Sequence, residues 1–304
     1  MDNFDNCVSF HIDNGAFLGR IVRLDKVINT ILKQHQYPIQ VSAVVAESTA
    51  LAALLSSTIK YNGLFTLQTK SSGPVPMIVV DVNSEGHIRA CANYDEARIK
   101  KAQELRKTTG QIEPAPCFMG DGVLAFTVDQ GPNTELYQGI VDLQGKTLSE
   151  CAMRYFKLSE QIDTYLQLYL QAPETENDDW KAAGVLLQKI PNKGGKETND
   201  EQDLTEAWNQ AVIFMQSLTE KELFDSSLST YDILHRLYHS NNLTINTTKE
   251  YQFQCRCSRE KLLNTLHGMK TEDIEAMCEN NKITATCNFC STDYVFDKGE
   301  LIAH

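Results

Sequence analysis

The sequence predicts an α+β protein in three parts: an N-terminal, mostly antiparallel sheet domain with helices (1–172), a helical connector (173–248) and a small, cysteine-rich C-terminal domain (249–304). Three observations support this division. Apolar residues alternate along much of the first part, acidic and turn-forming residues gather after residue 173, and four cysteines stand in two close pairs near the end. A chain of 304 residues can bury one or two hydrophobic cores.

Composition and charge exclude several classes of protein. Hydrophobic residues make up 42% of the chain and charged residues 22%, which is typical of a soluble globular protein. The 28 basic and 40 acidic residues give a net charge of −12, which repels a nucleic-acid backbone. The best apolar run, 41–55, is short for a membrane span and contains Glu47, and the acidic N-terminus does not resemble a secretory signal. We therefore expect a cytoplasmic protein without nucleic-acid or membrane partners.

The elements of the N-terminal domain follow from local periodicity. Apolar residues at helical spacing predict helices over 27–32 and 43–59, and Asn62-Gly63 ends the second. Alternating or β-branched runs separated by turn residues predict a β-meander, then a charged helix, then two more strands. The expected ranges are 64–69, 77–82 and 87–92 for the meander, 96–107 for the helix, and 123–128 and 135–143 for the later strands.

A capping box opens the next helix. Thr147 and Glu150 are spaced to satisfy free amides at its start, and the helix is expected to run to about Glu160. Residues 165–170 return to a period of two, which predicts a further strand on the same sheet, and Pro173 ends it.

The connector is predicted from its composition and from three helical patterns. Between residues 174 and 206 there are nine acidic residues against four lysines, which is typical of a domain boundary. Helices are then predicted over 204–218, from Thr219 onward and over 231–238. The first helix has an apolar face that we expect to dock on the N-terminal sheet. This face consists of Leu204, Trp208, Val212 and Met215.

The four paired cysteines carry the strongest chemical signal. Cys255 and Cys257 form one pair, Cys287 and Cys290 the other, and 29 residues separate the pairs. Two pairs of thiolates presented by two turns suit a tetrahedral Cys₄ zinc site, with Zn–S distances of about 2.3 Å. The first pair is C-x-C, so its turn is tighter than in a common zinc ribbon. We therefore expect a zinc-binding C-terminal domain with these four residues as ligands.

The other cysteines and the histidines fit no second site. Isolated cysteines are expected to be small buried hydrophobic residues. These are Cys7, Cys91, Cys117, Cys151 and Cys278. Because Cys278 lies nine residues before Cys287, a role beside the zinc site stays open for this residue alone. His267 lacks a spaced partner and is not expected to be a ligand. His235 and His239 lack a third ligand, so we expect them at the surface or at an interface. No hydrolase, metalloprotease or phosphate-binding motif is found, so we do not expect an enzyme.

Beyond these motifs, the sequence resembles the bacterial thirty-three-kilodalton heat-shock protein family of redox-regulated holdase chaperones, over nearly its whole length. The cysteine spacing carries the resemblance, together with further stretches. These are Cys257-Ser258-Arg259-Glu260, Tyr137-Gln138-Gly139-Ile140-Val141, Leu143, Gly145, Thr147-Leu148, Cys151, Tyr155-Phe156, Ser159-Glu160-Gln161, Ala183-Gly184-Val185-Leu186-Leu187-Gln188 and Arg236-Leu237-Tyr238-His239. One departure is Asn281 where the family has glycine. Asparagine tolerates a left-handed backbone best among the other residues, so we expect the turn to survive.

The resemblance implies a function in the stress response. It implies that the reduced, zinc-bound protein is inactive and that oxidation forms the disulfides Cys255–Cys257 and Cys287–Cys290. Zinc is then released, and the protein binds unfolding clients, prevents their aggregation and forms a homodimer. The strained C-x-C disulfide should be readily reduced again, and Cys287 with Cys290 is the candidate pair to oxidise first.

Physical considerations make such a switch plausible. The 56 residues from 249 to 304 can build only a marginal core, whereas a structural zinc contributes on the order of 10 kcal/mol to folding. Zinc also holds cysteines as thiolates, the form that oxidants attack. Loss of zinc should melt the domain and free the apolar face of the connector, which would then serve as the client-binding surface.

Two other functions stay open. A zinc-stabilised protein-interaction module would share the Cys₄ site without redox switching. A thiol–disulfide oxidoreductase is the weaker alternative, because a redox C-x-x-C motif belongs on a βαβ scaffold and this one lies in a short C-terminal domain.

Overall fold

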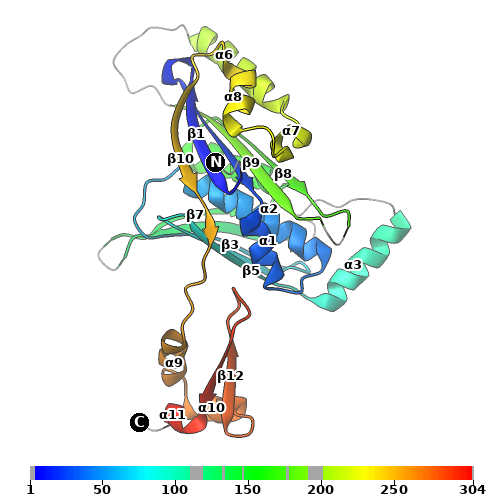
Figure 1. Cartoon of the computed structure of the whole chain (residues 1–304), viewed down its shortest axis with the longest axis vertical. Coiled ribbons are helices and arrows are strands. Elements are labelled where there is room, and N and C mark those ends of the chain that lie inside the picture. Colours follow the sequence, from blue (N-terminus) through cyan, green and yellow to red (C-terminus); the bar gives the residue numbers. More distant parts are fainter. Residues whose placement is uncertain are drawn as a thin grey trace.

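The computed structural model describes residues 4–109, 119–131, 134–145, 147–175, 178–190 and 201–302. A body built on two sheets carries a layer of helices on one side, and a small C-terminal module extends from the other side (Figure 1). Helices and strands are mixed throughout, and the strands pair almost entirely antiparallel, so the predicted α+β fold class is confirmed.

The first sheet has five antiparallel strands. In spatial order they are β10 (Thr244–Glu250), β1 (Asn6–Ile12), β2 (Phe17–Leu24), β9 (Lys181–Lys189) and β8 (Thr164–Gln171). β1 and β2 form a hairpin around the turn η1 (Asp13–Gly15). Strand β9 lies inside the sheet and is buried on both faces, which explains its continuous apolar run.

The second sheet contains the predicted meander. Its order is β11 (Gln252–Phe253), β5 (His87–Asn93), β4 (Met77–Asn83), β3 (Leu64–Ser71), β6 (Gly122–Asp129) and β7 (Tyr137–Asp142). All neighbours are antiparallel except the short β11, which adds to β5 in parallel. The chain therefore returns to this sheet immediately before the first cysteine pair.

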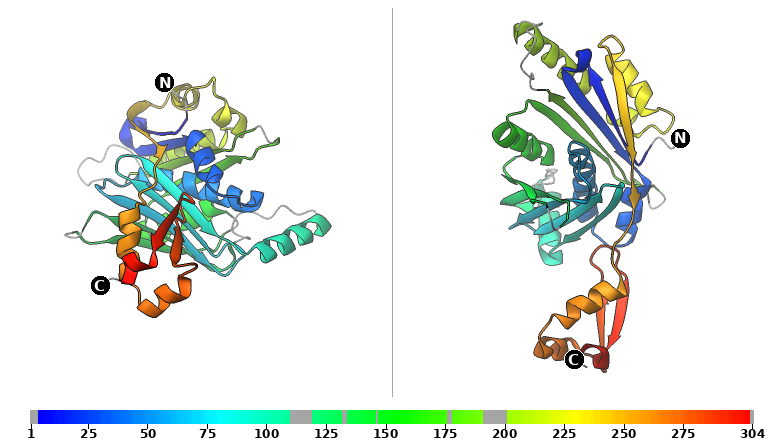
Figure 2. Two further views of the ribbon diagram at one scale, coloured as in Figure 1. Left: turned by 60° about the horizontal axis from the view of Figure 1, so that its bottom comes forward. Right: turned by 90° about the vertical axis from the view of Figure 1, so that its left-hand side faces the viewer.

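The hydrophobic core surrounds one helix. α2 (Ile39–Ser56) lies between the two sheets and packs against strands of both (Figure 2). Its length and composition would suffice for a membrane span, which corrects our expectation that no such segment exists. However, 78% of this apolar stretch is buried inside the protein, so its side chains form part of the hydrophobic core.

Four shorter elements complete the N-terminal body. They are α1 (Lys26–Lys33), α3 (Glu96–Thr109), α5 (Leu148–Tyr155) and the π-helical turn η2 (Phe156–Glu160). At the start of α5 the Thr147 side chain accepts a hydrogen bond from the Glu150 amide at 3.1 Å, as the capping motif predicts. Gln161, the residue after η2, has φ of 56°, so the helix ends at a residue in the left-handed region.

Three helices form a layer on the outer face of the first sheet. They are α6 (Glu201–Gln216), α7 (Glu220–Phe224) and α8 (Thr230–Tyr238), and α7 and α8 both begin with capping boxes. Arg23 of β2 is fully buried beneath this layer and donates hydrogen bonds to the carbonyls of Leu223, Asp225 and Leu228. Burial lowers the pKa of Arg23 to about 10, because its acceptors there are neutral carbonyl groups.

The C-terminal module is small. It contains α9 (Arg259–His267), α10 (Thr271–Met277), the hairpin of β12 (Lys282–Thr286) and β13 (Asp293–Asp297), and α11 (Lys298–Ile302). Among the described residues its buried hydrophobic core comprises only Leu266, Ile274, Ile283, Phe296 and Leu301. The module stands away from the two-sheet body and touches it mainly at its cysteine end (Figure 2).

Two predictions about the connector and the sheet need correction. Residues 165–170 do form a strand, β8, but it belongs to the first sheet and not to the sheet of the meander. Among the described residues of 173–248, strands β9 and β10 pair in the first sheet, and only the stretch from α6 to α8 is helical. Strands β1 and β2 had no counterpart in the sequence prediction. The boundaries of the three functional parts stay a proposal.

Candidate metal centre

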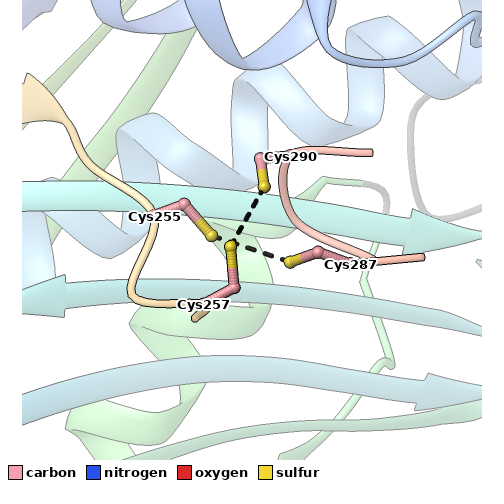
Figure 3. A group of neighbouring side chains, drawn as sticks. All are labelled: Cys255, Cys257, Cys287 and Cys290. Atoms are coloured by element: carbon pink, nitrogen blue, oxygen red, sulfur yellow. Dashed lines mark hydrogen bonds between the residues drawn. The ribbon is translucent and has the colours of Figure 1, made fainter. Parts of the chain in front are cut away.

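Four cysteine side chains meet between the N-terminal body and the C-terminal module. Cys255 and Cys257 lie directly after β11, whereas Cys287 and Cys290 lie in the turn between β12 and β13. Figure 3 shows the two pairs approaching from separate segments with their sulfur atoms pointing toward one another. The structure thus brings together all four residues that the sequence spacing selects.

The distances between the sulfur atoms suit a tetrahedral metal site. The Sγ atoms of Cys255 and Cys287 are 3.7 Å apart, those of Cys257 and Cys290 are 3.4 Å apart, and all four lie within 4.8 Å of one another. Sulfur ligands at the usual Zn–S distance would be about 3.8 Å apart at the corners of a tetrahedron. The four cysteines could therefore hold a metal ion, and the all-sulfur donor set suits zinc.

Backbone hydrogen bonds shape the second cysteine turn. The Cys287 amide donates to the Thr292 carbonyl at 2.9 Å, and the Ser291 amide donates back to the Cys287 carbonyl at 2.8 Å. Ser291 adopts φ of 52°, which closes the turn so that Cys287 and Cys290 present their sulfur atoms on one side. After the first pair, Ser258 caps α9 by accepting from the Lys261 amide.

The four thiols influence one another's ionisation. Burial, together with hydrogen bonds to the neighbouring thiols, raises the pKa of Cys257 to about 12, although the Tyr294 hydroxyl acts to lower it. Burial also acts to raise the pKa of Cys290, but hydrogen bonds with Thr292 and with the thiols of Cys257 and Cys255 outweigh it and lower that pKa to about 7. A bound divalent cation would remove this conflict, because its charge would stabilise all four cysteines as thiolates.

Sequence reasoning missed the residues of the N-terminal sheet that contact the centre. Asp81 of β4 and Arg89 of β5 lie beside the first cysteine pair, and His35 approaches Ser291 in the second turn at 3.3 Å. Asp81 and Arg89 are isolated residues in ordinary strands, and His35 follows the end of a helix. All three are far from the cysteines in the sequence. No local signal identifies them.

The other cysteines and histidines that the sequence analysis weighed as ligands do not belong to the four-cysteine cluster where the structure describes them. Cys7, Cys91 and Cys151 are buried as expected, and Cys278 packs half-buried against the core of the C-terminal module. Cys117 lies outside the described residues. His267 pairs its Nε2 with the Glu300 carbonyl at 3.0 Å, and the exposed rings of His235 and His239 stack 5.5 Å apart.

The asparagine that replaces glycine before the last pair is placed as predicted. Asn281 has φ of 62° and its neighbour Asn280 has φ of 52°, so both occupy the left-handed region at the start of the β12–β13 hairpin. The departure from the family pattern therefore leaves the turn intact.

The apolar face of the first connector helix lies against the first sheet. Met215 is fully buried in the cluster formed with β1, β2 and β9, and the other three residues pack half-buried around it. The expected docking on the N-terminal sheet is confirmed. In this state the proposed client surface is covered.

These features define a class of protein: an α+β body with a docked helical layer and a C-terminal module that carries a four-cysteine cluster able to hold a metal ion. The chain matches the family model described as "Hsp33 protein" over residues 5–297. The protein belongs to the Hsp33 family.

Relatives and a solved structure agree with this assignment. A 33 kDa chaperonin of Caulobacter vibrioides is 34% identical over 297 residues, which cover 96% of this chain and 95% of the relative. A 33 kDa chaperonin of Pseudomonas syringae pv. tomato is 36% identical over 290 residues, covering 95% and 89%. The crystal structure of the Hsp33 homologue of Thermotoga maritima has the same fold, with a TM-score of 0.78 and 22% identity over 98% of this chain and 96% of that one. Membership of this family supports a chaperone function.

Proposed function

We propose that the protein is a redox-regulated holdase chaperone. In the reduced form Cys255, Cys257, Cys287 and Cys290 hold one zinc ion, and the client-binding surface is covered. Oxidation forms disulfides, releases the metal and lets the protein bind unfolding proteins before they aggregate. The observation that carries this proposal is the convergence of the four sulfur atoms within 4.8 Å of one another, in a chain whose apolar α6 face is covered by the first sheet.

The cysteines supply both the metal ligands and the redox chemistry. When bound, zinc links the two turns and keeps the four sulfur atoms as thiolates. A thiolate attacked by a peroxide takes up one oxygen as sulfenic acid, and the second thiol of its pair displaces water to form the disulfide. The formation of each disulfide thus transfers two electrons from a cysteine pair to one peroxide molecule. The proposed pairs are Cys255–Cys257 and Cys287–Cys290, and the second pair is proposed to react first because a disulfide within the C-x-C pair closes a small, strained ring.

The C-terminal module should depend on its metal. Its core has five buried hydrophobic residues among those described, which is small compared with the clusters of the N-terminal body. A structural zinc contributes on the order of 10 kcal/mol to the folding of such a module. Disulfide formation removes the four ligands, so the module should unfold.

Unfolding of the module should loosen the helical layer. The segment that leads from α8 to the first cysteine pair is strand β10, an edge strand bonded only to β1 among the described strands. An unfolded module would no longer hold β11 and β10 in register, and α8 is their direct neighbour in the chain. Release of α6 would expose its apolar face together with the face of the sheet beneath it. Such surfaces bind unfolded chains without sequence preference.

A combined metal and aggregation assay tests this function. The reduced protein should contain one zinc per chain and should not suppress aggregation of a thermally unfolded model protein. Peroxide should release the zinc, and suppression should appear in parallel. A protein that keeps its zinc under mild peroxide would instead be a stable interaction module, whereas catalytic turnover of a disulfide substrate would indicate an oxidoreductase. The proposed location is the cytoplasm, and the proposed oxidised state is a homodimer.

A further inference from the structure

A row of polar residues crosses three strands of the second sheet beside the cysteine centre. Thr66 of β3, Asp81 of β4 and Arg89 of β5 are directly opposed in the sheet register. The Asp81 side chain is only 6% exposed, and its Oδ1 accepts a hydrogen bond from the Thr66 hydroxyl at 2.7 Å. Its Oδ2 accepts from Arg89 Nε at 2.8 Å and Nη2 at 2.7 Å. The sheet thus presents a rigid, buried ion pair.

The first cysteine turn binds to this ion pair through the residue between its two cysteines. β11 runs along β5, and the Gln254 amide donates to the Ile88 carbonyl at 3.1 Å, which carries the chain toward Asp81. Arg256, the middle residue of the C-x-C pair, then donates from Nη2 to Asp81 Oδ2 at 2.8 Å. Two arginines, one from the sheet and one from the cysteine turn, therefore share a single carboxylate oxygen.

The second cysteine turn binds to the other partner of the same pair. The Arg89 guanidinium lies over the ring of Phe289, 3.8 Å from its centroid, and Phe289 stands between Cys287 and Cys290. Arg89 Nη1 also lies 4.0 Å from Cys255 Sγ. A guanidinium held by a carboxylate and facing an aromatic ring is well suited to fix that ring in place.

We propose that Asp81 is a positioning residue for the cysteine centre: through Arg89 and Arg256 it holds both cysteine turns against the N-terminal sheet at the separation that metal binding needs. The inference rests on the proposed function for the identity of the metal ligands. The contacts explain why the non-cysteine residues of the two turns, Arg256 and Phe289, point to the same place on the sheet although they are far apart in the chain.

The charges also favour docking in the reduced state. Four thiolates and one divalent cation carry a net charge of two negative units, whereas Asp81 with two arginines leaves one positive unit beside them. Formation of two disulfides with loss of the cation makes the centre neutral and removes this attraction. The ion pair therefore binds the module more strongly in its metal-bound form than in its oxidised form.

Metal release from the reduced full-length chain tests the proposal. Asp81→Asn removes the shared charge, and Arg256→Gln removes one donor without altering the sheet. Each should release its metal to excess chelator roughly tenfold faster than the unsubstituted protein, the size expected for losing a charge-assisted hydrogen bond. The double variant should be no faster than Asp81→Asn, because both changes break the same contact. Arg256→Lys keeps a positive charge at this position, so its rate of metal release should lie between those of Arg256→Gln and the unsubstituted protein.

Glu300→Gln is the matched control. It breaks the ion pair between Arg259 and Glu300 at 2.8 Å, which lies wholly inside the C-terminal module and is more exposed. Its release rate should stay within about twofold of the unsubstituted protein. The melting temperature of the N-terminal body should not change in Arg256→Gln, whereas a merely structural role for this contact would lower it.

Hydrogen exchange at Gln252 and Gln254 gives a readout that does not depend on the metal. Their amides bond to the carbonyls of Gly86 and Ile88, so faster exchange in Arg256→Gln reports looser docking. Unchanged release rates and unchanged exchange in Arg256→Gln would overturn the proposal. Absence of metal from the unsubstituted protein would instead refute the proposed function, and the exchange measurement would still decide whether Asp81 docks the module.

Discussion

Each of the four paired cysteines contributes a sulfur atom that the others cannot replace. The other thiols that the structure describes are in other surroundings: Cys7, Cys91 and Cys151 are buried in the N-terminal body, and Cys278 packs against the C-terminal core. Removal of one ligand should therefore leave an incomplete three-sulfur site.

We predict that Cys257→Ser and Cys290→Ser lose the metal or bind it much more weakly, because a serine hydroxyl is a poor zinc ligand. Metal analysis of the purified variants and chelator competition measure this. Cys151→Ser, a change at a buried cysteine outside the cluster, should retain one zinc per chain. Full stoichiometry at unchanged affinity in both ligand variants would contradict the assignment.

Glu47 is a second residue with a distinct environment. It lies on α2 between the sheets, and burial raises its pKa to about 7 from the usual 4.5 of a glutamate. Between about pH 4.5 and pH 7 the folded protein therefore keeps the Glu47 carboxyl protonated, whereas the unfolded chain has already lost this proton. The contribution of this group to stability is complete below about pH 4.5 and falls as the pH rises through about 7.

We predict that Glu47→Gln stabilises the N-terminal body at pH 8 by about 2 kcal/mol, because an amide needs no costly deprotonation in the core. Near pH 5 the difference should be small. Urea unfolding at the two pH values, followed by circular dichroism, measures it. The exposed Glu206→Gln serves as the control, and an equal gain at both pH values would show that the carboxyl does not titrate in this range.

At the level of elements, the connector helices are held by a mixture of apolar packing and one buried cation. Met215 and the residues around it supply the packing, and Arg23 anchors the α7–α8 segment through three backbone carbonyls. A buried guanidinium with neutral acceptors gains hydration when the helices leave, which lowers the cost of their release.

We predict that peroxide treatment raises amide exchange from Leu204 to Tyr238 and lowers the helix content, while 65–170 stays protected. The N-terminal body has a large hydrophobic core of its own, whereas the core of the C-terminal module is small. Strand β9 should stay protected with the body, because it lies inside the first sheet. Hydrogen exchange on reduced and oxidised protein gives the comparison.

Two other outcomes of that experiment have clear meanings. Unchanged protection across 204–238 in protein that has lost its zinc would make the metal a simple structural staple. A uniform loss of protection that includes 65–170 would point to general oxidative damage.

At the level of the whole molecule, net charge and surface decide how clients are bound. The chain carries a net charge of −12, and the covered face of α6 is apolar. Binding through such a face is driven by removal of apolar surface from water, which salt does not weaken.

We predict that the oxidised protein suppresses aggregation of a model client equally well at low and high salt. Light scattering of the client at several sodium chloride concentrations measures this, with the client alone at each concentration as the control. Loss of suppression at moderate salt would favour electrostatic capture, since exposed charges are screened over about 10 Å at 0.1 M.

Much of the fold was predictable because the determining interactions are local. The meander from β3 to β5 follows from alternation interrupted by turn residues, and the caps at Thr147 and Thr219 follow from residues three positions apart. The cysteine cluster was predictable for the same reason, because each pair lies within a single turn.

The division into two sheets was decided only in the tertiary structure. Strand β9 pairs with β2 across a large separation in the chain, with Phe17 opposite Lys189, and its continuous apolar run is compatible with several burial sites. Whether β8 joins the meander or the first sheet depends on which packing around α2 buries more apolar surface, and no local pattern records that choice.

The same distinction holds at the metal centre. Residue types and spacing in the sequence by themselves selected the four cysteines that meet in the structure, since a turn of three or four residues delivers each pair. The docking of these turns on Asp81 and Arg89 was decided by the fold, because Arg256 meets Asp81 across 175 positions of the chain. A contact of that kind exists only after strand pairing and core packing have brought the two segments together.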